Sequence, residues 1–230
     1  CSEFLRQILV QHHGQAPDKV RRIFNAYHGP RAEDVTETQD DAVRKLGLDV
    51  SKRYVLTICR LMNWKRVDNV LRALVGLPDD VHLLIAGDGD MQAEWQALAA
   101  ELGVADRATF LGNVSHSEIP LWIRAANVFV LNSEYEGLSH TLLEVQALGT
   151  PIVASGVCGN PEVVEDGVNG LLVDPRDPES VRVALARLLD DTDLQARFVA
   201  AGLERRGDFL REGTFGEVES VLRKACGSPH

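Results

Sequence analysis

Six short runs of apolar residues alternate along this sequence with segments of helical hydrophobic spacing. The runs occupy residues 54–59, 81–86, 108–111, 127–131, 151–154 and 170–173. Each run is nearly continuous rather than alternating in polarity, which is typical of strands that helices cover on both faces. Strands that alternate with helices form parallel sheets through right-handed crossovers. The sequence therefore predicts an α/β fold with a Rossmann-like, doubly wound parallel sheet.

Helices are expected between these runs, at residues 67–77, 91–102, 117–126, 139–148 and, briefly, 161–165. Three boundary residues support this assignment. Pro120 falls in the first turn of a helix, whereas Gly103 and Gly149 each follow the end of one.

The two ends of the chain differ from this pattern. Residues 2–13 predict a lone helix, 20–24 a lone strand, 29–41 an acidic, turn-rich linker, and 192–226 two further helices. We therefore expect an interdomain remnant with its linker at 1–50, the Rossmann-like domain at 51–191 and C-terminal helices at 192–230. The first residue is Cys1 rather than Met, which leads us to expect that the chain is part of a longer product.

Charge and cysteine content narrow the class of partner. The formal net charge is −10 and no basic stripe is present. This argues against nucleic acid, because phosphate neutralisation needs clustered Lys and Arg. The four cysteines are scattered, with no C-x-x-C pair. We therefore expect no metal site and a reducing, cytoplasmic location.

Two carboxylates, Glu136 and Glu144, surround the start of the helix that follows the fourth apolar run. Open parallel sheets bind ligands at the carboxyl ends of their strands. Carboxylates there suit a ligand rich in hydroxyl groups, such as a sugar nucleotide, and Glu144 could accept hydrogen bonds from a ribose diol. Free N–H groups near Leu138, Ser139 and His140 could hold a phosphate. The alternative is that Glu144 faces solvent.

Arg60 and Lys65 follow the first apolar run, and both can point over the same edge of the sheet. Such a pair can neutralise a leaving diphosphate without a metal. Basic residues are also common in surface loops, so these two alone do not establish a site.

Asp88-Gly89-Asp90 matches a D-x-D pattern that binds a metal ion in some enzymes. Two carboxylates can hold a divalent cation against a diphosphate. Here glycines end a strand and open a helix, so a tight turn explains the stretch better.

Several short motifs follow one another in a fixed order along residues 20–190. They are Arg60-Leu61 with Lys65, Gly87-Asp88-Gly89, Phe110-Leu111-Gly112, Ser133 with Glu136-Gly137, Leu143-Glu144 with Ala147, Gly149-Thr150-Pro151, Gly159-Asn160-Pro161-Glu162-Val163-Val164 and Gly167-Val168-Asn169-Gly170-Leu171-Leu172-Val173. In this order they resemble the C-terminal, donor-binding domain of the GT-B fold retaining glycosyltransferases of group 1, also called family four. The Rossmann-like domain would then be one half of a GT-B fold.

The resemblance implies roles for the charged residues. Arg60 and Lys65 would hold the donor diphosphate, and Glu136 would contact the donor sugar; these three form the catalytic set. Glu144 would bind the ribose diol.

The resemblance also implies a cradle of backbone groups. Gly137, Leu138 and Ser139 would complete the sugar site, and the loop after Gly112 would lie near the base. No metal and no cofactor would be needed beyond the nucleoside diphosphate sugar, which is the substrate.

The sequence departs from the family pattern in three places. Cys158 replaces a usual glycine, Val145-Gln146 replaces small or methionine residues, and Asn25-Ala26-Tyr27 replaces an asparagine-glycine turn. The first two would alter the shape of the donor pocket without removing its charged residues.

The resemblance implies an enzyme of polysaccharide or glycoconjugate biosynthesis that transfers a hexose-type unit to a hydroxyl acceptor with retention. An N-terminal acceptor-binding domain would lie outside this chain and could serve a membrane or lipid acceptor, with peripheral membrane contact. This chain alone would then show slow or no transfer. Two alternatives stay open: a non-catalytic module that binds nucleotide sugars, and a GT-B-like sugar epimerase or phosphorylase.

Overall fold

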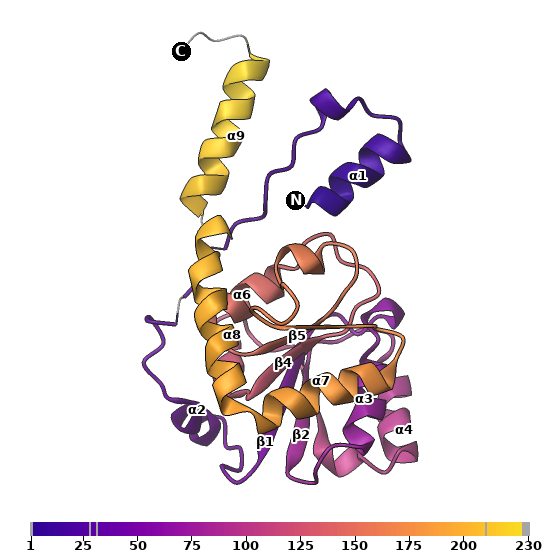
Figure 1. Ribbon diagram of the computed structural model, residues 1–230. Coiled ribbons are helices and arrows are strands. Elements are labelled where there is room, and N and C mark those ends of the chain that lie inside the picture. The colour runs from indigo at the N-terminus through magenta and orange to yellow at the C-terminus, as the bar shows by residue number, and fades with distance from the viewer. Residues whose placement is uncertain (1, 28, 31, 210, 227–230) are drawn as a thin grey trace.

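The computed structural model of the protein describes residues 2–27, 29–30, 32–209 and 211–226. Six parallel strands form one sheet in the order β3-β2-β1-β4-β5-β6 (Figure 1). The strands are β1 (Arg53–Ile58), β2 (Val81–Ala86), β3 (Ala108–Gly112), β4 (Val128–Leu131), β5 (Ile152–Ser155) and β6 (Leu171–Val173). Each predicted run differs from its strand by at most one residue at either end, so the predicted Rossmann-like α/β fold is confirmed.

Helices cover both faces of the sheet, as the continuous apolar runs require. One face packs against α3 (Val67–Val75), α4 (Gln92–Glu101) and α7 (Pro178–Asp190), and the other against α2 (Gln39–Lys45), α5 (Ile119–Ala125) and α6 (His140–Leu148). Neighbouring strand residues serve opposite faces: Val55 belongs to the first apolar cluster and Leu56 to the second. Both side chains are at most 1% exposed.

The C-terminal helices are α8 (Thr192–Arg205) and α9 (Arg211–Ala225), as predicted for this region. Leu194 and Phe198 of α8 join the apolar cluster beneath α7, whereas α9 extends away from the sheet (Figure 1). No helix in the described ranges is both long and apolar enough to span a bilayer.

The predicted strand at residues 20–24 is wrong. Within the described part of the chain no strand pairs with this stretch, and a strand needs a partner for its backbone N–H and C=O groups. The ring of Phe24 instead packs on that of Phe209, with 5.0 Å between centroids. The lone helix predicted at 2–13 is present as α1 (Glu3–Gln11).

Two further elements differ from the sequence prediction. Helix α2 begins inside the stretch expected to be a turn-rich linker, because Thr38 and Asp41 form a reciprocal capping box at its start. Its residues Ala42 and Val43 are buried in the core. The short helix expected at 161–165 is a single 3₁₀ turn, η4 (Asn160–Glu162).

The strand order places a crevice between β1 and β4. From β1 the chain moves outward through β2 and β3, then returns to the other side of β1 and continues through β4, β5 and β6. The loops that leave the carboxyl ends of β1 and β4 therefore diverge. Ligands of open α/β sheets bind in such a crevice.

Candidate functional site

Lys65 and Glu136 meet at this crevice, although they are far apart in sequence. Lys65 ends the 3₁₀ turn η2 (Asn63–Lys65) after β1, and Glu136 lies in the loop after β4. The Lys65 ammonium donates a hydrogen bond to Oε1 of Glu136. The two side chains are only 16% and 15% exposed. A partly buried ion pair is thus built at the point where the sheet topology predicts ligand binding.

The Glu136 carboxylate has a second partner, which the sequence did not reveal. Ser133 Oγ donates to the same oxygen, Oε1, at 2.9 Å. Ser133 itself is fully buried. In the sequence Ser133 belongs to a motif, but nothing in that motif indicates a function for this residue.

Arg60 follows β1 at the same edge of the sheet, five residues before Lys65. It is exposed and lines a cavity of about 240 Å³ over the ends of β1, β2 and β3. Asp88, Asn113 and Thr141 also line this cavity. Asn113 Nδ2 donates to Asp88 Oδ2 at 2.5 Å, so the Asp88 carboxylate is engaged by the loop after β3.

Glycines allow the strand ends to approach closely around this cavity. Gly87 has a φ of +120°, and a Cβ there would stand 2.0 Å from the carbonyl oxygen of Cys59. Gly112 has a φ of +67° at the end of β3. Both conformations favour glycine. The turn interpretation of Gly87-Asp88-Gly89 fits this geometry, and no group of three His, Cys, Asp or Glu side chains in the described residues could hold a metal ion.

Glu144 lies one turn beyond Thr141 on α6, so the two share a helix face. Its side chain is 20% exposed, and Oε1 lies 4.0 Å from His116 Nε2. The carboxylate also faces Tyr27. The pKa of the Tyr27 hydroxyl is raised, mainly by burial and to a lesser extent by the negative charge of Glu144. Glu144 is therefore directed toward neighbouring loops rather than bulk solvent.

The start of α6 presents backbone N–H groups toward this edge. Ser139 is the N-cap, and its Oγ accepts the N–H of Leu142. Within the described parts of the chain, the N–H groups of Leu138, Ser139 and His140 donate to no other protein group. An anion could accept them, because a helix N-terminus combines free donors with a favourable dipole.

The loop after β5 presses against the loop after β4. The Gly159 N–H donates to the Glu136 carbonyl at 3.0 Å. A Cβ at Gly159 would lie 1.8 Å from the carbonyl oxygen of Gly137. Cys158, which departs from the family pattern, has a φ of +57°, the left-handed region that glycine prefers.

An ion-pair cluster braces the outer side of the same loop. The Glu134 carboxylate accepts hydrogen bonds from Arg66 at 2.8 Å and from Arg176 at 3.0 Å. Both hydrogen bonds lower the pKa of Glu134, and the bond from Arg176 has the larger effect. Sequence reasoning missed this cluster, since nothing in the spacing of the three residues joins them.

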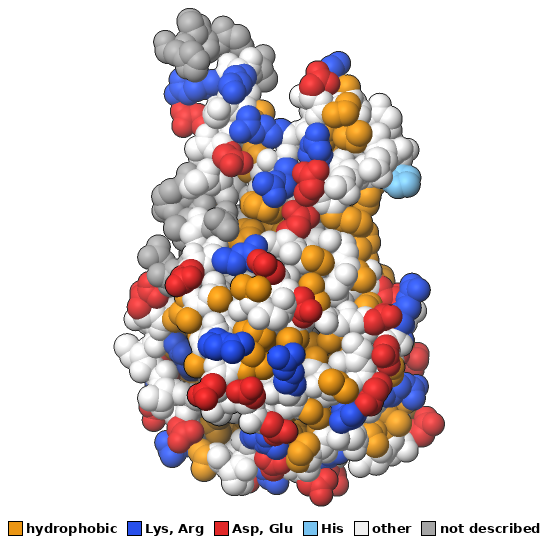
Figure 2. Space-filling model, viewed as in Figure 1, with side chains coloured by type: hydrophobic (Ala, Val, Ile, Leu, Met, Phe, Trp, Pro, Cys, Tyr) orange, Lys and Arg blue, Asp and Glu red, His pale blue; other side chains and the backbone are white. Residues whose placement is uncertain are grey.

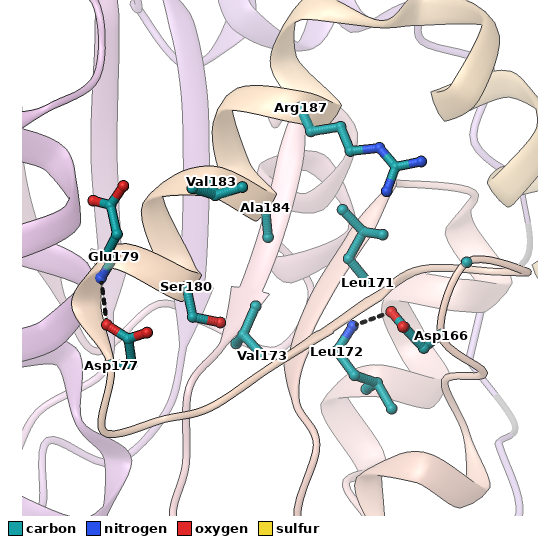
Figure 3. Close-up of a pocket in the computed structure, with 11 residues that line it drawn as sticks. Asp166, Leu171, Leu172, Val173, Asp177, Glu179, Ser180, Val183, Ala184 and Arg187 are labelled. Carbon is teal, nitrogen blue, oxygen red and sulfur yellow. Dashed lines mark hydrogen bonds between the residues drawn. The ribbon is translucent and has the colours of Figure 1, made fainter.

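A separate cavity of about 460 Å³ opens between β6 and α7, at the edge of the sheet (Figure 3). Its carboxylates serve local structure: Asp166 accepts the N–H of Leu172, and Asp177 accepts the N–H of Glu179 at the start of α7. None of the predicted site residues lines this cavity. On the face that Figure 2 shows, acidic and basic side chains are interspersed, in keeping with the absence of a basic stripe in the sequence.

Comparison with known sequences places this geometry in context. Residues 38–205 match the family model described as "Glycosyl transferases group 1". D-inositol 3-phosphate glycosyltransferase of Thermobispora bispora is 34% identical over an alignment 237 residues long. The alignment covers 92% of this chain and 55% of that protein. An uncharacterised glycosyltransferase of Methanocaldococcus jannaschii is 32% identical over 179 residues, covering 76% of this chain and 46% of that protein. The chain spans about half the length of the curated relatives it matches.

Solved structures share the fold. Anabaena HepE, crystallised with UDP and glucose, superposes with a TM-score of 0.88 at 22% identity, over 97% of this chain and 62% of that one. Sucrose-phosphate synthase of Thermosynechococcus elongatus superposes with a TM-score of 0.87 at 28% identity. The match covers 99% of this chain and 58% of that one. The likeness to HepE concerns the fold alone, but the family match extends over most of this chain. The chain belongs to the group 1 glycosyltransferase family.

Proposed function

We propose that this chain binds a nucleoside diphosphate sugar and forms the donor-binding part of a retaining glycosyltransferase. A hexose-type unit would pass to a hydroxyl group of an acceptor bound by a further domain. The observation that carries the proposal is the Lys65–Glu136 pair at the β1/β4 crevice. It sets a cation and a carboxylate side by side, next to the free N–H groups at the start of α6.

Lys65 and Arg60 would bind the diphosphate. When the glycosidic bond breaks, negative charge builds up on the leaving diphosphate, and fixed cations stabilise that charge more than they stabilise the bound donor. Lys65 is held by Glu136 until the donor arrives. The diphosphate would then take a share of the Lys65 ammonium, which has three N–H donors.

Glu136 would accept hydrogen bonds from hydroxyl groups of the donor sugar. Its carboxylate has about four acceptor positions. The backbone of Gly137, Leu138 and Ser139 would line the same site. The role of the chain is then positioning and charge stabilisation.

Glu144 would accept hydrogen bonds from the two ribose hydroxyls. Its position beside Thr141, which lines the 240 Å³ cavity, supports this assignment. The base would then lie over the ends of β2 and β3, near the loop after Gly112. HepE was crystallised with UDP and with UDP-glucose, so these two compounds are the first probes to test.

Thermal unfolding with a panel of probes tests the proposal. The panel contains UDP, ADP and GDP with their glucose or mannose conjugates. A probe at about 100 times its Kd should stabilise the chain by ~2.7 kcal/mol, which raises Tm by roughly 5–10 °C in a domain of this size. If no member of the panel raises Tm, donor binding by this chain is refuted.

Glu144→Ala tests the ribose assignment separately. The substitution should weaken binding of the nucleoside diphosphate itself by at least about tenfold, since hydrogen bonds to a charged group contribute ~1.5–3 kcal/mol. Glu179→Ala is a matched control, because Glu179 pairs with Arg182 on α7, away from the site. Equal affinities for the Glu144→Ala and Glu179→Ala proteins would exclude the ribose contact.

A further inference from the structure

A chain of buried hydrogen bonds runs from η4 to the Glu136 carboxylate. Asn160 Nδ2 donates to Ser155 Oγ at 2.9 Å, and Ser155 Oγ donates to the carbonyl oxygen of Ser133 at 2.6 Å. Ser133 Oγ then donates to Glu136 Oε1 at 2.9 Å. Ser133, Ser155 and Asn160 are each 0% exposed.

This series of hydrogen bonds extends the pairing of β4 with β5 through side chains. The backbone ladder between the two strands ends at the pair Leu131 and Ala154. One residue further along β5, the hydroxyl of Ser155 reaches across to the loop that carries Glu136. The position of that loop is thereby tied to the rigid sheet, which holds side chains more accurately than a free loop.

The hydrogen bonds leave one side of the carboxylate available. Oε1 of Glu136 accepts from both Ser133 and Lys65. Among the residues that the structure describes, none donates to Oε2. The carboxylate is therefore held by one oxygen and can accept a ligand hydroxyl with the other.

Three fully buried polar side chains are costly unless their hydrogen bonds are satisfied. Here each of the three side chains donates one hydrogen bond within a connected series that ends on the residue that meets Lys65, although Asn160 Oδ1 accepts none from the described residues. We propose that Ser133, supported by Ser155 and Asn160, is the positioning residue that directs Glu136 toward the donor sugar. This inference rests on the function proposed above for Glu136.

Binding measurements on the 230-residue chain can separate positioning from general structural support. Calorimetry would give Kd values for UDP and UDP-glucose, and for GDP and GDP-mannose, with wild type and Ser133→Ala. We expect Ser133→Ala to bind the nucleoside diphosphate within about twofold of wild type. We expect it to bind the sugar conjugate about tenfold more weakly, because a misdirected Glu136 loses a charged hydrogen bond to the sugar.

Three further variants and one matched control calibrate this result. Glu136→Gln removes the carboxylate charge, so its Kd for the sugar conjugate shows how much affinity the whole sugar contact contributes. Ser155→Ala and Asn160→Ala should show smaller losses in the same direction, since they act through Ser133. Thr150→Val is the matched control: its hydroxyl is also buried and donates to a carbonyl, that of Ile123, but it lies before β5 at the opposite end of the strand.

The outcomes distinguish the two proposals. If wild type binds the probes and Ser133→Ala leaves the ratio of the two Kd values unchanged, the positioning role is refuted and the proposed function stands. An equal loss for diphosphate and sugar conjugate would indicate a structural role and also refute positioning. If wild type binds no probe, the proposed function fails, and crystal structures of wild type and Ser133→Ala decide the inference. An unchanged Glu136 rotamer would overturn it, and a displaced carboxylate would support it.

Discussion

Gly159→Ala tests how tightly the loops after β4 and β5 fit together. The φ of Gly159 is −86°, which any residue can adopt, so the substitution adds no backbone strain. The added Cβ would stand 1.8 Å from the carbonyl oxygen of Gly137 and 2.7 Å from its carbon. Both are backbone atoms, and neither can rotate away as a side chain could.

The structure sets the size of the effect. Ordinary contact begins at 3.4 Å, so the loops must separate by roughly 1.6 Å to relieve the closest clash. That movement breaks the hydrogen bond from the Gly159 N–H to the Glu136 carbonyl, now 3.0 Å long, which contributes about 1 kcal/mol. Overpacking of an ordered region costs a further 1–3 kcal/mol, roughly. We therefore expect a loss of about 2–4 kcal/mol in the free energy of unfolding.

Urea denaturation of the purified chain gives this free energy directly, and a thermal scan should show Tm lowered by roughly 4–16 °C. Gly216→Ala in α9 is the matched control, because a Cβ there meets nothing within 4 Å. Alanine is a better helix former, so this control should be neutral or up to about 1 kcal/mol more stable. A Gly159→Ala protein as stable as wild type would refute the close approach of the two loops.

The remaining predictions concern titratable groups. Lys65→Met and Glu136→Gln should each cost about 1–3 kcal/mol in urea denaturation, and the double variant should cost less than their sum; strict additivity would mean that the pair does not interact. The pKa of Glu134 is lowered below its ordinary 4.5, by the hydrogen bond from Arg176 first, so its stabilisation is complete above about pH 4.5 and is lost as the pH falls through the folded-state value. Glu134→Gln should therefore flatten the fall in stability between about pH 5 and 3, and identical pH profiles would contradict this reasoning. Burial raises the pKa of the Cys59 thiol to about 11, so iodoacetamide at pH 7.5 should label it far more slowly than free glutathione; equal rates by mass spectrometry would exclude the shift.

The sheet and part of the site could be predicted from the sequence because they depend on local pattern. The continuous apolar runs correspond to strands that helices cover on both sides, and their order predicts a parallel sheet. Lys65 and Glu136 could be assigned to one edge because each follows the carboxyl end of its strand. The strand predicted at 20–24 fails for the complementary reason: among the described residues, no neighbouring strand pairs with it and accepts its hydrogen bonds.

The contacts that set the geometry of the site could not be predicted in this way. Ser155 reaches Ser133 across 22 positions of sequence, and Arg66 reaches Glu134 across 68. Neither pair shares a period or a motif, so only the folded arrangement of strands brings them together. The same holds for Gly159, whose requirement for a hydrogen atom in place of a side chain comes from Gly137 rather than from its own backbone angles.

The close fit of Gly159 against Gly137 bears on how the candidate site could be re-engineered. Suppose residues 133–139 are replaced with those of a related protein. The new loop after β4 would then fit the loop after β5 of that protein and not the one in this chain. With 1.8 Å between a would-be Cβ and the facing carbonyl, an unmatched partner leaves either a clash or a gap. Residues 133–139 and 156–160 therefore act as one structural unit, and libraries that aim to change ligand binding at the candidate site should vary both segments together.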